Sequence, residues 1–215
     1  MKYGKLIVIE GACDGVGKST QIELLRKRLL KEGYKVLCHH FPTYDLHQGR
    51  GVEEFLKGTY GDIKDLSFYF INNLYAYDRM ITWQTILKKA YSEGYIILLD
   101  RYTTSSLIYQ TASLKGGKEM ATFEYDKLGT KKPDRVIFLN VPYSLNVKMR
   151  RKRNENKAED IIEQNEKYLH EVYDSALYTA KYLNWTSVMC AKDDKLRTVE
   201  EIHDDIYENI KDLLD

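Results

Sequence analysis

The chain has 215 residues, and its 33 lysines and arginines nearly balance its 32 aspartates and glutamates. This length fits one domain with a substantial core, and the charge balance argues against the sustained basic field that nucleic acids or anionic membranes attract. The three cysteines share no metal or redox spacing, and no apolar run approaches the roughly 20 residues of a membrane helix. We therefore expect a single domain over residues 1–215, cytoplasmic, with no nucleic-acid or membrane partner.

The most informative stretch is KLIVIEGACDGVGKSTQ at residues 5–21. An apolar β-branched run leads into a glycine-rich turn and then an amphipathic segment, which is the strand–loop–helix arrangement of a phosphate-binding P-loop. Backbone N–H groups of such a loop point at phosphate oxygens, and the helix N-terminus adds partial positive charge. The pattern predicts that Lys18 reaches the β- and γ-phosphates of ATP and that Ser19 binds Mg²⁺. The predicted ATP-binding residues are Gly11, Gly15, Val16, Gly17, Lys18, Ser19 and Thr20.

The glycine spacing of this loop departs from the usual pattern. Five residues separate Gly11 from Gly17 where four are usual, and Ala12 holds the place of the first glycine. The loop therefore either carries one extra residue or has changed register.

Strand-like and helix-like segments alternate along the chain. Apolar runs typical of strands lie at 6–9, 34–38, 95–100, 135–140 and 186–190. Helical periodicity is found at 22–30, 52–57, 65–91, 104–115, 118–129, 143–153, 161–183 and 199–214. Asp65 and Thr198 are the expected N-caps of two of these helices. The alternation predicts an α/β fold, a three-layer domain with a five-stranded parallel sheet.

The run at 95–100 is apolar until it ends in Asp100. Unbroken hydrophobicity is typical of a strand buried on both faces, and an acid at its carboxyl end lies at the ligand-binding edge of a parallel sheet. Beside a P-loop, Asp100 is the expected second carboxylate for Mg²⁺ or its water shell, together with Ser19.

A basic cluster at 149–153 precedes a polar segment at 154–160 that has no apolar period. A charge run is usually a solvated face, but beside a phosphate-transfer site it indicates a closing lid. We predict this lid at about 150–160.

Six motifs together resemble the thymidylate kinase family over nearly the full chain. They are the P-loop with Gly-Lys-Ser-Thr-Gln, Phe-Pro-x-Tyr after the second strand, Tyr-Ala-x-Asp-Arg on the long helix, Asp-Arg-Tyr after the third strand, Lys-Pro-Asp before the fourth, and Asp-x-x-Glu after the basic segment. The stretch Leu-Asp-Arg-Tyr-Thr-Thr-Ser-Ser, together with Trp185 and the tail Glu200-Glu201-Ile202-His203, resembles a divergent bacterial branch. The resemblance implies the P-loop NTPase fold of nucleoside monophosphate kinases, transfer of phosphate from Mg-ATP to dTMP, and a homodimer.

The resemblance also implies roles for individual residues. Asp14 matches an acid that approaches the ribose 3′-hydroxyl of the acceptor, and Tyr75 matches an aromatic ring that stacks on thymine. Arg79 matches the arginine that reaches the base, and Arg101 matches the one that grips the acceptor phosphate. The other substrate-binding positions implied are Phe41, Tyr44, Ser106, Tyr109, Asp160 and Glu163.

The P-loop of this chain lacks the catalytic arginine that some family members carry there, because residues 14–16 are Asp-Gly-Val. The resemblance therefore assigns this charge to the lid. Its candidates are Arg150, Arg151 and Arg153, which join Lys18, Asp14 and Arg101 as expected catalytic residues.

Three alternative interpretations stay open. One is another nucleotide or nucleoside kinase on the same fold, although nucleoside kinases generally place a carboxylate base where this chain has Phe41 and Pro42. A regulatory GTPase is suggested by 126–129 and 131–134, but neither segment lies at the proper end of a strand. A catalytically inactive nucleotide-binding protein is suggested only by the P-loop spacing.

Overall fold

The computed structural model describes residues 3–113, 117–154, 162 and 164–214. Its central sheet has five parallel strands, as predicted, and their order is β2-β3-β1-β4-β5. The strands are β1 (Lys5–Gly11), β2 (Val36–His40), β3 (Ile96–Asp100), β4 (Arg135–Asn140) and β5 (Thr186–Met189). Parallel strands direct all their carboxyl ends to one edge, so β1 and β3 deliver the P-loop and Asp100 side by side.

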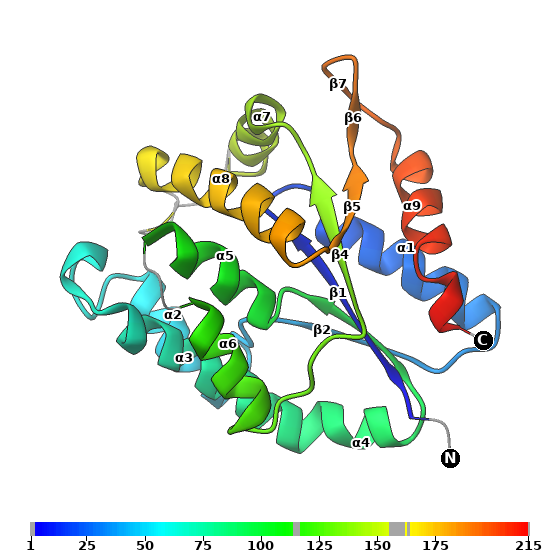
Figure 1. The fold of residues 1–215 in the computed structure, drawn as a ribbon, viewed down its shortest axis with the longest axis horizontal. Coiled ribbons are helices and arrows are strands. Elements are labelled where there is room, and N and C mark those ends of the chain that lie inside the picture. The colour runs from blue at the N-terminus through cyan, green and yellow to red at the C-terminus, as the bar shows by residue number, and fades with distance from the viewer. Residues whose placement is uncertain (1–2, 114–116, 155–161, 163, 215) are drawn as a thin grey trace.

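Helices cover both faces of the sheet and complete the three layers (Figure 1). One face carries α1 (Lys18–Lys31) and α9 (Val199–Glu208). The opposite side carries α3 (Phe68–Thr82), the π-helical turn η3 (Trp83–Leu87), α4 (Lys88–Ser92), α5 (Thr103–Ser113), α6 (Gly117–Asp126) and α8 (Glu166–Tyr182). The remaining short elements are α2 (Arg50–Leu56), α7 (Tyr143–Asn154), η1 (His47–Gly49), η2 (Ile63–Asp65), the hairpin β6–β7 (Ala191–Lys192, Lys195–Leu196) and η4 (Lys211–Leu213).

The core divides between the two faces of β1. Ile7 and Ile9 pack with α1 and α9, whereas Leu6 and Val8 pack against the η3 and α4 side. Side chains alternate between the faces of a strand, so an unbroken apolar run fills both layers at once. This burial holds the strand that ends in the P-loop.

Two expected helix starts differ from those in the structure. Leu66 is extended, so the long helix begins at Phe68, and Ser67 rather than Asp65 caps it by accepting a hydrogen bond from the Phe70 N–H at 3.1 Å. The helix expected at 161–183 begins only at Glu166, with Asn165 as its cap. Thr198 does cap α9, in a capping box with Glu201.

No helix in the described part of the chain combines the length and apolar character that crossing a membrane requires. Residues 155–160 of the predicted lid lie outside the described residues, as do residues 161 and 163.

Candidate active site

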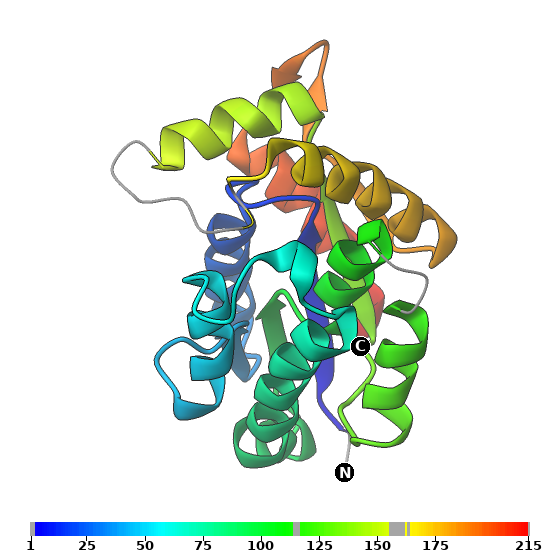
Figure 2. The same ribbon diagram turned by 90° about the vertical axis from the view of Figure 1, so that its left-hand side faces the viewer.

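A cavity of about 290 Å³ lies near the P-loop, bordered by α3, α5 and α8. Figure 2 shows α7 and α8 passing over this end of the molecule. The predicted site residues that line the cavity are Asp14, Tyr44, Tyr75, Arg79, Arg101, Ser106, Tyr109 and Arg150. Phe41 lies beneath the wall, packed on Tyr102 with ring centroids 5.6 Å apart, and its neighbour Pro42 is the residue that lines the cavity. Positions far apart in the sequence thus meet in one space.

The two ends of the P-loop lie close together between β1 and α1. A Cβ atom on Gly11 would lie 2.6 Å from Val16 Cγ2, so the first glycine permits the close approach of the loop's two ends. Gly17 has φ 95°, in the left-handed region that favours glycine, and leads directly into the first turn of α1. That turn begins with Lys18, which is buried. Ser19 follows it, and Thr20 after that is exposed.

The two predicted metal ligands lie together at the start of α1. The Ser19 hydroxyl donates a hydrogen bond to Asp100 Oδ2 at 2.9 Å, and Lys18 Nζ lies 3.9 Å from Asp100 Oδ1. Burial by itself would raise the pKa of Asp100, but the interaction with His40 and the Lys18 charge outweigh it, so that pKa is lowered. Asp100 Oδ1 is fully buried and has no hydrogen-bond partner among the described residues. A charged carboxylate whose Oδ1 accepts no hydrogen bond among the described residues, beside a hydroxyl, fits Mg²⁺, which prefers oxygen ligands.

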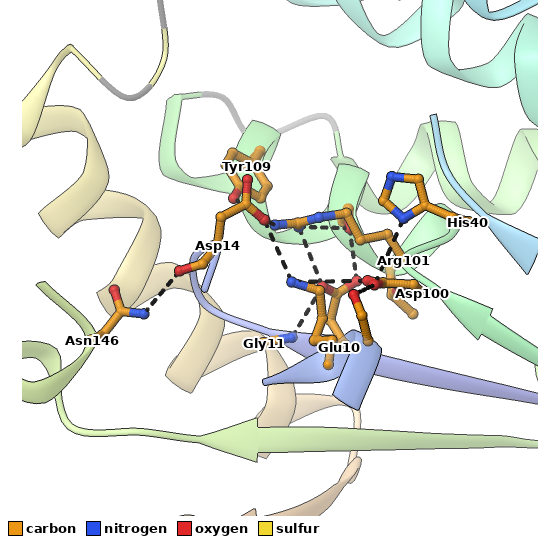
Figure 3. A network of polar contacts seen from close by, with 12 residues as sticks. Glu10, Gly11, Asp14, His40, Asp100, Arg101, Tyr109 and Asn146 are labelled. Atoms are coloured by element: carbon orange, nitrogen blue, oxygen red, sulfur yellow. Dashed lines mark hydrogen bonds and ion pairs between the residues drawn. The ribbon is translucent and has the colours of Figure 1, made fainter. Parts of the chain in front are cut away.

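Arg101 follows β3 and reaches toward the P-loop (Figure 3). Its Nη2 forms an ion pair with Asp14 and donates to the Tyr109 hydroxyl at 3.3 Å, while Nη1 lies 3.5 Å from Glu10 Oε1. The Arg101 backbone has φ 65°, which is uncommon for a residue other than glycine. This conformation turns the chain sharply at the end of the strand. Burial would lower the pKa of Arg101, but the charge of Asp14 and its other neighbours raises it well above its ordinary value. Arg101 is therefore a permanent cation on the cavity wall.

Glu10 is a functional candidate that sequence patterns did not identify. It is fully buried near the end of β1 and accepts hydrogen bonds from the hydroxyls of Thr104 and Ser105, both at 2.7 Å, besides facing Arg101. It therefore ties the strand before the P-loop to the start of α5. An acid inside an otherwise apolar strand was the available signal, because a buried carboxylate requires partners.

Arg79 is almost completely buried on α3 and is paired with Glu124 of α6. Its Nε donates to Glu124 Oε2 at 2.7 Å, and its Nη2 donates to Glu124 Oε1 at 2.6 Å and to Ser106 Oγ at 2.9 Å. Burial would lower the pKa of Arg79, but the Glu124 carboxylate raises it instead. Sequence patterns gave no role to Glu124, which has no exposed surface.

Asp78, next to Arg79 on α3, holds the turn that follows β2. It accepts hydrogen bonds from both the backbone N–H, at 2.8 Å, and the hydroxyl of Thr43. This fixes the backbone beside Tyr44, whose ring lines the cavity. The Asp-Arg pair on α3 thus serves two walls of the site.

Two of the three arginines predicted for the lid lie on α7 with described side chains. Arg150 is buried, lines the cavity and donates to Glu166 at 3.0 Å, whereas Arg151 is largely exposed and lies 3.5 Å from the same carboxylate. The side chain of Arg153 lies outside the described part of the structure, as do Asp160 and Glu163.

Comparison with known proteins finds one matching family model, described as thymidylate kinase, over residues 9–206. A probable thymidylate kinase of Pyrococcus abyssi is 30% identical over 213 residues, which are 97% of this chain and 96% of the relative. A thymidylate kinase of Plasmodium falciparum is 29% identical over 97% of this chain and 90% of its own length. A thymidylate kinase of Schizosaccharomyces pombe is 33% identical over 64% of this chain and 61% of its own length.

These relatives come from an archaeon and two eukaryotes. They lend no support to the bacterial branch that the Leu-Asp-Arg-Tyr stretch suggested. In the structure that stretch carries Asp100 and Arg101, and its Thr104 and Ser105 hydroxyls donate hydrogen bonds to Glu10.

Proposed function

This chain belongs to the thymidylate kinase family, and we propose that it transfers the γ-phosphoryl group of ATP to dTMP, giving ADP and dTDP. The observation that carries the proposal is that most of the predicted acceptor residues line one cavity beside the P-loop. An oxygen of the dTMP phosphate attacks the γ-phosphorus, and the bond to the β,γ-bridging oxygen breaks. Such a reaction requires positioning and charge neutralisation rather than covalent catalysis.

The donor side of the site consists of the P-loop and the first turn of α1. Backbone N–H groups of the loop and the positive end of α1 bind the phosphates of ATP, and Lys18 balances the charge that develops on them. Ser19 and Asp100 would hold Mg²⁺, which when bound supplies further neutralisation of phosphate charge. Asp100 suits this role because its pKa is lowered and it stays charged.

The acceptor side has separate places for the phosphate and for the base. Arg101 binds the phosphate, and Asp14, which now pairs with Arg101, turns to the ribose 3′-hydroxyl when the nucleotide enters. Tyr75 stacks on the base and Arg79 donates a hydrogen bond to it. Tyr109 lies against Arg101 and borders the ribose.

The segment at about 150–160 acts as the lid, and Arg150 is the lid arginine best placed to reach the transferring phosphoryl group. It is buried and lines the cavity, whereas Arg151 is mostly exposed. Closing the lid excludes water, which would otherwise accept the phosphoryl group in place of dTMP.

The deciding experiment measures diphosphate formation from Mg-ATP with dTMP, dUMP, dCMP, dGMP, dAMP, UMP and CMP as separate acceptors. A strong preference for dTMP is the expected result. A preference for another monophosphate would keep the mechanism and replace the base assignment. No transfer to any acceptor, with ATP still binding, would contradict the proposal and favour a nucleotide-binding role.

Replacing Tyr75 with alanine should mainly weaken acceptor binding. A stacked ring contributes about 1–3 kcal/mol per base, so the KM for dTMP should rise about tenfold or more while the KM for ATP stays unchanged. Steady-state kinetics with each substrate varied in turn measures this. Tyr178→Ala is the matched control, because this tyrosine on α8 is largely exposed and is not among the residues that line the cavity. An equal rise in both KM values would contradict the stacking role.

Assembly as a homodimer and a cytoplasmic location complete the proposal. The aromatic side chains exposed on α3, among them Tyr69 and Tyr77, provide apolar surface for a second copy. All three cysteines are free, as expected in a reducing compartment. Light scattering after size exclusion would give the mass of the particle directly.

A further inference from the structure

The Arg79–Glu124 pair leaves one part of the guanidinium available. Nε and Nη2 both donate to Glu124, and Nη2 also donates to Ser106. Nη1 has no hydrogen-bond partner among the described residues, and Arg79 lines the cavity. A guanidinium is planar, so hydrogen bonds from both Nε and Nη2 to one carboxylate fix the direction of the remaining N–H groups.

The two arginines of the cavity differ in how firmly they hold their acids. The Asp14 side chain that pairs with Arg101 is 37% exposed, so an incoming phosphate can take its place. The Glu124 side chain is fully enclosed, so no ligand can displace it from Arg79. The Arg101 end of the cavity therefore suits an anion, and the Arg79 end, neutralised by its own carboxylate, suits an uncharged polar group.

We propose that Glu124 is a positioning residue that selects the acceptor base by directing Arg79 Nη1 at a ring carbonyl oxygen. The inference rests on the proposed function, in which Arg79 meets the base. Guanidinium nitrogens only donate hydrogen bonds, so the oriented N–H groups suit the C4 carbonyl of thymine or uracil and are mismatched with the amino group that cytosine carries at that position. Leaving such a donor unpaired is costly, which makes the contact a source of specificity.

The test compares Glu124→Gln with the wild-type chain. Glutamine keeps the size of the side chain but places an NH₂ group against the donors of Arg79, so the guanidinium loses its fixed direction. The KM for dTMP should rise about tenfold to a hundredfold, as expected when a positioning contact is lost. The preference for dTMP over dCMP in kcat/KM should fall about tenfold. The KM for ATP should stay within about twofold of the wild-type value.

Glu93→Gln is the matched control, because Glu93 pairs with Lys89 on the surface, 3.9 Å away. It should leave every constant unchanged. If the wild-type chain phosphorylates dTMP and Glu124→Gln keeps both its KM and its preference, the inference is overturned while the proposed function stands. If the wild-type chain transfers phosphate to no monophosphate, the proposed function fails, and calorimetric titration with dTMP and dCMP measures the preference instead.

A second pair of variants guards against a Glu124→Gln chain that fails to fold. Arg79→Met and the double variant Arg79→Met/Glu124→Met are compared, the latter without a buried unpaired charge. If Glu124 acts through Arg79, both variants have the same raised KM for dTMP and the same weakened preference. A double variant with wild-type preference, or with a KM well above that of Arg79→Met, would overturn the inference.

Discussion

Replacing Lys18 with alanine is expected to lower kcat for dTDP formation by about 10²–10³-fold, effectively abolishing turnover, because an oriented charge facing the reacting phosphates is lost. Lys18 is 6% exposed, and its ammonium group lies between Asp14, at 3.5 Å, and Asp100, at 3.9 Å. These two acids hold it at the mouth of the P-loop. Alanine removes the charge but favours the helix that Lys18 begins, so α1 stays in place.

The matched control for this variant is Lys27→Ala on the same helix, since Lys27 is exposed and pairs only weakly with Glu23 at 3.5 Å. Both variants should show wild-type circular dichroism, and only Lys18→Ala should lose activity in an assay of ADP formation. Near wild-type kcat in Lys18→Ala would show that the P-loop lysine has no part in the reaction.

Local sequence patterns were sufficient to predict the sheet and the meeting of Ser19 with Asp100 at its carboxyl edge. The P-loop and the end of β3 each have a compact signature, and a parallel sheet brings their ends to the same edge. This is why Ser19 and Asp100, 81 residues apart in the chain, could be paired in advance and are found 2.9 Å apart.

The acids that hold the arginines could not be predicted in the same way. Glu124 lies 45 residues from Arg79 on another helix, and Glu10 lies 91 residues from Arg101. No periodicity links such pairs, because the first contact depends on how α3 and α6 pack and the second on the register of β1 against β3. Only the general rule that a buried charge must be paired indicated that partners existed.

Element boundaries failed where local geometry overrode composition. Asp65 has the right chemistry for an N-cap, but Leu66 beyond it is extended, so Ser67 is the first residue whose side chain can reach the helix. The hairpin β6–β7 was missed because its turn uses Asp193 and Asp194, both with positive φ, where a glycine would have signalled it.

Arg101→Ala is expected to abolish turnover and to lower the free energy of unfolding by about 3–5 kcal/mol, the usual cost of removing one partner of a buried ion pair. Glu10 has no exposed surface, and without the Arg101 guanidinium its buried carboxylate would lose the cation that it faces. Asp14 would lose its ion pair with Arg101 as well, so the acid would no longer be held on the acceptor side. Chemical denaturation measures the loss of stability, and single-turnover transfer from ATP to dTMP measures the loss of activity.

The double variant Arg101→Ala/Glu10→Gln separates the two roles of this arginine. Glutamine can still accept from the hydroxyls of Thr104 and Ser105, and it removes the uncompensated charge, so much of the lost stability should return. Activity should not return, because the acceptor phosphate still lacks its cation. Recovery of both would mean that Arg101 serves only to neutralise Glu10, and near wild-type kcat in the single variant would contradict its catalytic role. We therefore expect the double variant to regain stability without regaining activity. The reason is that the Arg101 guanidinium faces two different acids: Glu10, which is buried and fixed, and Asp14, which a phosphate can replace.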